Sequence, residues 1–176
     1  MNIFDKNYLD RLSVISFDDN NKKALFDDDK NRYVNFDKKV LKEIYKITQK
    51  GYCDTLSAVD TIIQDNDTLY LIEFKNQTKE NIKKYEIYSK AMESLAILQK
   101  YFFCDKKYKF VLIVLFNGYK DNKKNKRLGT SYSLQNIPKY FQLSRYHKII
   151  FDEIYTLDKN IFLQFKTHFN FAKEWK

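Results

Sequence analysis

The run from Phe110 to Phe116, Phe-Val-Leu-Ile-Val-Leu-Phe, is apolar without interruption. Successive side chains of a strand point to opposite sides of a sheet, so a strand with this sequence would be apolar on both faces. Such strands occur where both faces of the sheet are covered. The run is also far shorter than the roughly 20 residues that a membrane-spanning helix needs. It therefore predicts a buried strand near the middle of a sheet.

Two helical stretches and a hairpin precede this strand. Apolar residues recur at helical spacing from about residue 36 to 50 and again from about 79 to 100. Between them, residues 55–75 are rich in β-branched, aromatic and aliphatic side chains on either side of a polar turn, which is typical of a β-hairpin. The order helix, strand, strand, long helix, strand predicts an α/β fold, a central mixed β-sheet flanked by helices on both faces.

The chain of 176 residues is long enough for one sizeable core and too short for two ordinary domains. We expect a single domain in three parts: an irregular or partly helical N-terminal arm (1–35), a core (about 36–116) and a C-terminal extension (128–176). In the extension, residues 149–155 predict another strand. Residues 158–175 predict a closing helix with Asp158 near its N-cap.

The net charge favours anionic partners. The chain has 32 Lys and Arg against 23 Asp and Glu, a net charge of +9, and such an excess attracts nucleic acid or an acidic membrane surface. Abundant Lys, Asn, Ile, Phe and Tyr is also what an AT-rich genome encodes, so part of the charge can reflect mutational bias. No strongly basic amphipathic helix stands out, so we expect no membrane association.

Cysteine usage and the first residues bear on the compartment. Cys53 and Cys104 stand alone, without the paired spacing of a zinc site or a disulfide framework. The first six residues include acids where a secretory signal would have a basic and then an apolar stretch. These features predict a protein of the reducing cytoplasm.

The tripeptide Glu73-Phe74-Lys75 ends the second strand of the hairpin. Alternation along the strand places Glu73 and Lys75 on one face and Phe74 on the other. Acid-x-Lys is common in so charged a chain, but this copy lies at the end of a strongly apolar strand. Two charges there indicate either a functional site or a Glu73 to Lys75 surface ion pair, which contributes little to stability.

Asp60 joins these residues if the hairpin turn has two residues. With the turn at Asn66-Asp67, counting back along the strands places Asp60 directly opposite Glu73. A turn one residue longer would move Asp60 to the other face, because side chains alternate. Asp54 is the alternative acid for that case.

Two carboxylates and a lysine on one patch are suited to metal-assisted hydrolysis. Carboxylates a few ångströms apart repel one another unless a cation lies between them. Their hard oxygen atoms favour Mg²⁺ or Mn²⁺, which can activate water and polarise a phosphate. Lys75 could orient the water and stabilise charge that develops on the phosphate.

The stretch from about Phe36 to Phe116 resembles the PD-(D/E)XK nucleases, a restriction-endonuclease-like superfamily whose core runs helix, strands carrying Asp and then Glu-x-Lys, helix, strand. The resemblance implies that Asp60, Glu73 and the Phe74 backbone carbonyl bind the metal and that Lys75 is the catalytic lysine. Before Asp60, Val59 stands where the family nominally has proline.

Many members of the superfamily add an acid from the first helix, and Glu43 is the candidate here. Its place in the helix puts it either at the edge of the buried stripe or on a solvated face. Gln77 follows the motif as a glutamine does in some branches, where it helps to hold substrate or metal; a polar residue at a helix N-terminus is an equally good interpretation.

Four lysines are candidates for substrate binding. Lys83 and Lys84 begin the long helix, and Lys123 and Lys124 lie in a basic loop after the apolar strand. All four could contact phosphates, although runs of charge are more often simply solvated faces.

The sequence thus predicts a Mg²⁺- or Mn²⁺-dependent nuclease, an endonuclease more than an exonuclease. Its substrate would be DNA, with RNA as the alternative. Cutting both strands with one site per chain would call for a homodimer. The alternative from another class is a non-catalytic protein-binding module, such as an immunity or adaptor protein, that retains the fold.

Overall fold

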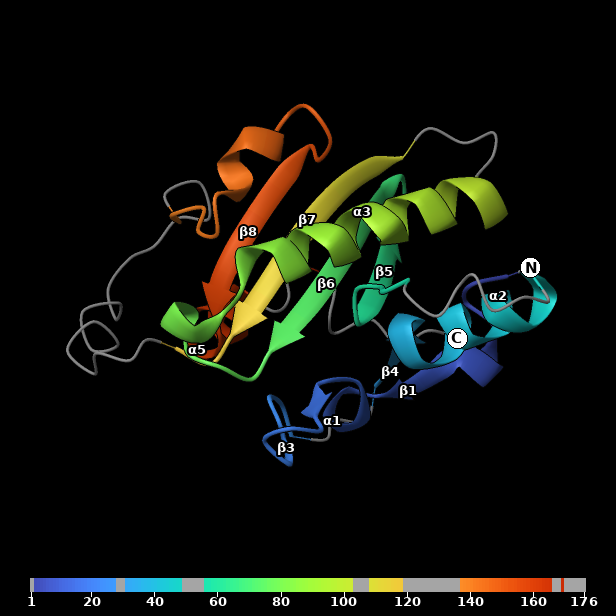
Figure 1. Cartoon of the computed structure of the whole chain (residues 1–176), viewed down its shortest axis with the longest axis horizontal. Helices are drawn as coiled ribbons and strands as arrows, with labels where there is room; N and C mark the ends of the chain where they lie inside the picture. The colour runs from blue at the N-terminus through green and yellow to red at the C-terminus, as the bar shows by residue number, and fades with distance from the viewer. Residues whose placement is uncertain are drawn as a thin grey trace.

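A six-stranded mixed sheet forms the centre of the computed structural model, which describes residues 2–27, 31–48, 56–102, 108–118, 137–165 and 169 (Figure 1). Its strands, in spatial order, are β1 (Leu9–Arg11), β4 (Arg32–Asn35), β5 (Thr61–Asp65), β6 (Thr68–Lys75), β7 (Lys109–Phe116) and β8 (Glu153–Asp158). The first four pair in antiparallel fashion, and β6, β7 and β8 are parallel. The predicted mixed sheet is confirmed.

Short and long helices connect these strands. They are α1 (Leu12–Ile15), the π-helical turn η2 (Phe36–Val40) that runs into α2 (Leu41–Thr48), α3 (Lys84–Tyr101), α5 (Lys159–Phe165), and the 3₁₀ turns η1 (Lys6–Tyr8), η3 (Lys79–Asn81) and η5 (Leu143–Tyr146). A separate two-stranded ribbon joins β2 (Phe17–Asp18) to β3 (Lys23–Ala24). Within the described ranges, no helix has the length and apolarity to cross a membrane.

Helices cover both faces of the sheet, as predicted. On one face, apolar side chains of α2 and α3 pack on the sheet, and Figure 1 shows α3 crossing its front. On the other face, side chains of α1 and α5 pack with Phe26 and Phe74. The side chains of β7 from Val111 to Phe116 are all buried, which fits a strand that is apolar on both sides. β7 is an interior strand, between β6 and the edge strand β8.

The N-terminal arm was predicted to be irregular or partly helical, and this prediction is wrong in part. β1 adds an edge strand to the main sheet by pairing Leu9 with Val34, and β2 and β3 form the ribbon. Strands of two to four residues are too short to show a hydrophobic period. The sheet extends beyond the predicted core on both sides, with β1 and β4 at one edge and β8 at the other.

The C-terminal extension also differs from the prediction. The last strand covers 153–158 instead of 149–155, because the chain turns just before it: Lys148 has φ 62°, and Ile149 is 80% exposed. The predicted N-cap is confirmed, since the Asp158 carboxylate accepts hydrogen bonds from the backbone N–H groups of Asn160 and Ile161. The predicted end of this helix lies outside the described residues.

Candidate active site

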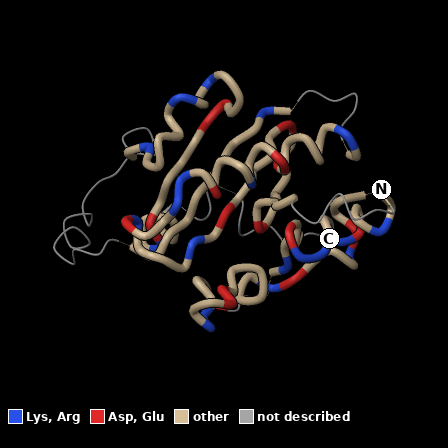
Figure 2. The backbone as a smooth tube through the Cα atoms, viewed as in Figure 1, with Lys and Arg blue, Asp and Glu red and all other residues tan. Residues whose placement is uncertain are grey.

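The register of the hairpin brings the predicted residues together. Asp65 pairs with Thr68 across a two-residue turn, in which Asn66 adopts the left-handed conformation that asparagine tolerates (φ 52°). Thr61 pairs with Ile72, so Asp60, one residue earlier, lies opposite Glu73. Figure 2 shows acidic and basic residues gathering where this end of the hairpin meets α3. The predicted register is confirmed.

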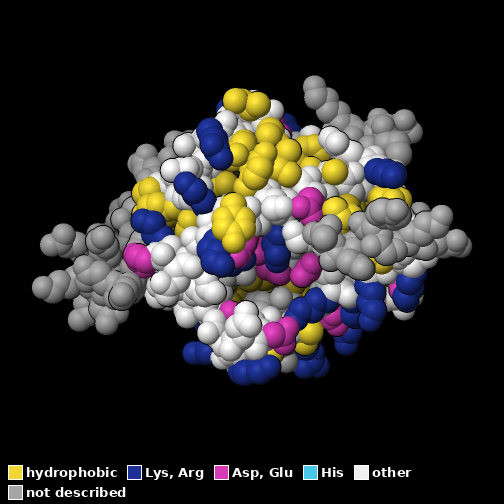
Figure 3. Space-filling model, viewed as in Figure 1, with side chains coloured by type: hydrophobic (Ala, Val, Ile, Leu, Met, Phe, Trp, Pro, Cys, Tyr) yellow, Lys and Arg dark blue, Asp and Glu magenta, His cyan; other side chains and the backbone are white. Residues whose placement is uncertain are grey.

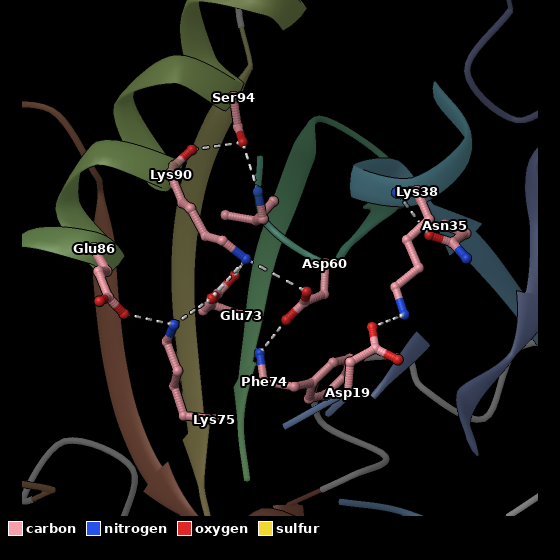
Figure 4. Close-up of polar contacts among 11 residues, drawn as sticks. Asp19, Asn35, Lys38, Asp60, Glu73, Phe74, Lys75, Glu86, Lys90 and Ser94 are labelled. Carbon is pink, nitrogen blue, oxygen red and sulfur yellow. Dashed lines mark hydrogen bonds and ion pairs between the residues drawn. The ribbon is translucent and has the colours of Figure 1, made fainter. Parts of the chain in front are cut away.

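Glu73 lies at the centre of the cluster and is only 1% exposed. Its Oε1 is 3.0 Å from the Nζ atoms of both Lys75 and Lys90, and Lys90 Nζ also donates to Oε2 at 3.3 Å. Figure 4 shows both lysines converging on this carboxylate, one from β6 and one from α3. A buried carboxylate is stable only when it is paired in this way.

Asp60 is held by the backbone of the opposite strand. Its Oδ2 accepts a 2.6 Å hydrogen bond from the Phe74 N–H, and its Oδ1 lies 3.7 Å from Lys90 Nζ. Burial, reinforced by the negative charge of Glu73, raises the pKa of Asp60 well above its ordinary value, although Lys90 and the Phe74 N–H oppose the shift. The two carboxylates thus compete for one ammonium group.

The Phe74 side chain points to the opposite side of the sheet. Its ring packs edge-on against Phe26, with centroids 5.7 Å apart, in the core beneath α1 and α5. Alternation along β6 therefore occurs as predicted: the motif presents two charges to one face and one aromatic ring to the other.

Lys75 contacts a second acid besides Glu73. Its Nζ lies 3.6 Å from Oε2 of Glu86, in the first turn of α3. The Lys75 side chain is 15% exposed, so its ammonium reaches the solvent-accessible edge of the cluster. The sequence also allowed Glu73 and Lys75 to form a simple surface ion pair. The structure does not have such a pair, because Glu73 is buried.

Lys90 was not predicted as a site residue. Burial alone would lower the pKa of its ammonium, but the charges of Glu73, Asp60 and Asp37 outweigh burial and raise it. The helix that carries it is fixed by Ser94, whose hydroxyl accepts from the Val59 N–H at 2.9 Å and donates to the Lys90 carbonyl at 2.7 Å. Its one sequence signal is the spacing of Glu86, Lys90 and Ser94, which places them along one side of a helix.

Asp37 is a second residue that sequence reasoning missed. It lies in the π-helical turn η2, a type of turn that is frequent at functional sites. Burial and the charge of Glu73 raise the pKa of Asp37, and Lys90 opposes the shift. Asp37, and not Glu43, is the acid of the first helical segment that interacts with the cluster.

A hollow of about 170 Å³ opens onto this cluster, and we call it the site hollow. Figure 3 shows a depression on this face, with acidic and basic side chains at its rim. The ribbon of β2 and β3 lines one side through Phe17, Asp18 and Asn20. Asp60, Glu73 and Lys75 line the other, so a ligand in the hollow would contact both.

The remaining predicted residues are dispersed. Gln77 lines the site hollow. Glu43 lines a different hollow beside α2 and pairs with Lys46. Lys83 pairs with Glu86 at 3.6 Å, and Lys84 donates to Gln142 at 2.8 Å; neither lysine lines the site hollow. Lys123 and Lys124 lie outside the described residues.

The donor set fits a divalent cation in part. Among the described residues, no three His, Cys, Asp or Glu side chains are grouped so that they could hold a metal together. Two carboxylates do converge, but Glu73 Oε1 already lies 3.0 Å from the ammonium groups of both Lys75 and Lys90. Lys90 contacts both carboxylates, so any metal held by both would compete with its ammonium.

Comparison with protein families, with curated proteins and with solved structures finds no match. What defines this chain is its own geometry: an α/β fold with a six-stranded mixed sheet and a buried acid-lysine cluster where β5, β6 and α3 meet.

Proposed function

We propose that this chain is a metal-dependent nuclease of the PD-(D/E)XK type that hydrolyses phosphodiester bonds in DNA. One observation carries the proposal: Glu73 is buried at 1% exposure, with Asp60 beside it and the ammonium groups of Lys75 and Lys90 both 3.0 Å from its Oε1. Burying this many charges is expensive, and a hydrophobic core of the same size is commonly as stable or more stable. A catalytic role would explain why the chain keeps this cluster in place of apolar residues.

Each residue has a distinct role in this proposal. Asp60 and Glu73 would hold Mg²⁺ or Mn²⁺, with the Phe74 carbonyl as a further ligand. When bound, the ion supplies a lowered pKa for an attacking water and compensates negative charge on the phosphate. Lys75 orients the attacking water and stabilises the charge that develops on the phosphate oxygens. Lys90 positions the two carboxylates.

The order of elements also supports the proposal. The helix formed by η2 and α2, the hairpin with Asp60 and then Glu73-x-Lys75, α3, and β7 follow one another along the chain, as the resemblance implies. The acid expected from the first helix, Glu43, lines the other hollow, and the acid of that helical segment whose charge acts on Asp60 is Asp37.

The test is cleavage of supercoiled and linear plasmid DNA with Mg²⁺, Mn²⁺ or EDTA. We expect cutting that requires the metal and falls at least a hundredfold in Asp60→Ala and in Lys75→Ala. Lys109→Ala is the matched control, because Lys109 is exposed at the far end of β7, and it should cut like the wild type. Nicking or linearisation of the supercoiled form identifies an endonuclease.

No cutting with either metal, or equal cutting by all variants, would overturn the proposal. The alternative would then be the protein-binding module, in which the acid-lysine cluster is only an internal charge network. That function predicts a stoichiometric partner and no metal binding.

A further inference from the structure

A second hollow, of about 510 Å³, lies beside α2, and we call it the α2 hollow. Among the described residues, four that line it are lysines and one, Glu43, is an acid. The lysines are Lys38, Lys39, Lys42 and Lys46. Figure 3 shows Lys and Arg side chains gathering on this part of the surface, beside the depression over the site.

Three of these lysines recur at every fourth residue. Lys38, Lys42 and Lys46 advance by about 6 Å per step, because the helix rises about 1.5 Å per residue. The first of them belongs to the π-helical turn η2 and the others to α2, yet all three line the α2 hollow. Like charges at this spacing repel one another, and the helix itself supplies a counter-charge to Lys46, through Glu43.

The ion pairs within the chain neutralise this row only in part. Lys39 is engaged, since its Nζ donates to the Asp10 carboxylate at 2.9 Å and to the Leu9 carbonyl at 3.1 Å. Lys46 pairs with Glu43 on the helix surface. The side chain of Lys42 is exposed and has no hydrogen bond or ion pair to any residue in the described part of the chain.

Lys38 connects the row to the active site. Its Nζ lies 3.8 Å from Asp19, a contact between exposed groups that holds it weakly. Figure 4 shows the Lys38 side chain extending from the helix toward Asp19, close to Asp60. The neighbours of Asp19 in sequence, Asp18 and Asn20, line the site hollow. A chain leaving the site on this side would therefore meet Lys38 first and then α2.

We propose that Lys38, Lys42 and Lys46 bind the phosphodiester backbone of DNA that flanks the cleaved bond. The choice of DNA as ligand depends on the proposed function; the cationic row itself does not. Lysine is suited to this task, because its compact ammonium contacts phosphate as a point charge without reading sequence. The lysines predicted earlier, Lys83 and Lys84, are lining residues of neither hollow.

The test is binding of a fluorescent DNA duplex in EDTA, measured by anisotropy at several salt concentrations. The double variant Lys42→Ala/Lys46→Ala removes two lysines of the row. Lys100→Ala/Lys109→Ala is the matched control: it removes the same charge from the far ends of α3 and β7. Coincident thermal unfolding of the two variants would show that both are folded.

We expect the row variant to bind DNA at least tenfold more weakly. The slope of log K against log salt concentration should fall in magnitude by about two, because each phosphate contact contributes about 0.9 to this slope. The control should change Kd less than twofold. Equal losses in both variants would overturn the proposal, since net charge alone would then explain binding. Displacement of DNA by poly-aspartate at equal charge concentration would also overturn it, in favour of an acidic protein surface.

Binding in EDTA separates this proposal from the nuclease proposal, because no metal-dependent cleavage takes place. A chain that binds DNA through the row but never cuts it supports the row and refutes the nuclease. If the wild type cuts DNA but the two double variants bind it equally well, the nuclease proposal is supported and the lysine row is refuted.

Discussion

Glu73 and Lys90 form a largely buried ion pair at the site, and its energetics can be tested at the residue scale. Removing one partner of such a pair leaves a buried charge without compensation, which costs far more than the intact pair contributes. Lys75 also lies 3.0 Å from Glu73, so part of the compensation would survive the loss of Lys90.

Lys90→Met should therefore lower the free energy of unfolding by on the order of 3 kcal/mol. The matched control is Lys109→Met, at an exposed position at the other end of the sheet, where the change should stay within about 0.5 kcal/mol. Urea unfolding in EDTA measures both. Adding Glu73→Gln to Lys90→Met should restore stability, since the uncompensated charge is removed; an additive further loss would contradict this account.

The raised pKa of Asp60 predicts a dependence on pH. Burial and the charge of Glu73 make the folded chain hold a proton on Asp60 at a pH where the unfolded chain has released it. The folded state then binds more protons, so the free energy of unfolding falls as pH rises from about 4, the ordinary carboxyl value, through the raised pKa.

Asp60→Asn removes this titration while it keeps the shape of the side chain. In EDTA, the stability of the wild type relative to Asp60→Asn should decline as pH rises from 4 to 8, measured by urea unfolding at each pH. Titrating groups that do not interact with Asp60 cancel in the difference. A difference that grows with pH would mean that Asp60 is stabilised as the charged form, and the sign assigned here would be wrong.

At the scale of elements, the ribbon of β2 and β3 is hydrogen-bonded to Asn76, directly after the Glu73-Phe74-Lys75 motif of β6. Asn76 Nδ2 donates to the Lys23 carbonyl at 2.7 Å, and Asn21 Nδ2 donates to the Asn76 carbonyl at 3.3 Å. The ribbon lines the site hollow, so this fastening sets the width of the hollow.

Asn76→Ala removes the shorter of these two bonds, a loss of about 1 kcal/mol. Local opening of the ribbon should become several-fold more frequent, and hydrogen exchange of the amides in 17–24 should accelerate accordingly. Gln64→Ala is the control, because Gln64 makes a comparable exposed hydrogen bond in the hairpin, away from the ribbon. Unchanged exchange in Asn76→Ala would show that packing of the ribbon, not this bond, holds it.

The elements also show how much the sequence could predict. The hairpin and its register were predictable because turn length and side-chain alternation are local properties, and they suffice to bring Asp60 to Glu73. Lys90 and Asp37 were not, because their positions depend on how α3 and η2 pack against the sheet. The edge strand β1 has three residues, too few for any period to be visible.

At the scale of the whole molecule, acids and lysines are distributed unequally between two hollows. Among the described residues, the site hollow is lined by the acids Asp18, Asp60, Glu73 and Glu86 and by the lysines Lys75 and Lys90. The α2 hollow is lined mostly by lysines. A divalent cation in the first and an anionic polymer along the second would each compensate the local charge.

Metal binding should therefore stabilise the whole fold, because the two carboxylates come together only when β5 pairs with β6. A ligand that binds only the folded state adds RT ln(1 + [L]/Kd) to the free energy of unfolding, about 2.7 kcal/mol at a hundred times Kd. For a chain of this size, that corresponds to a rise in Tm of about 2–4 °C per kcal/mol.

Thermal unfolding with increasing Mn²⁺ or Mg²⁺ should show this rise in the wild type and in Glu43→Gln, and should show little of it in Asp60→Asn. The rise should also shrink as pH falls, because protons compete with the metal for Asp60. A shift of equal size in Asp60→Asn would place the bound ion elsewhere. The absence of any shift in the wild type would mean that Lys90 permanently occupies the position of the cation, so that the cluster serves the fold and not catalysis.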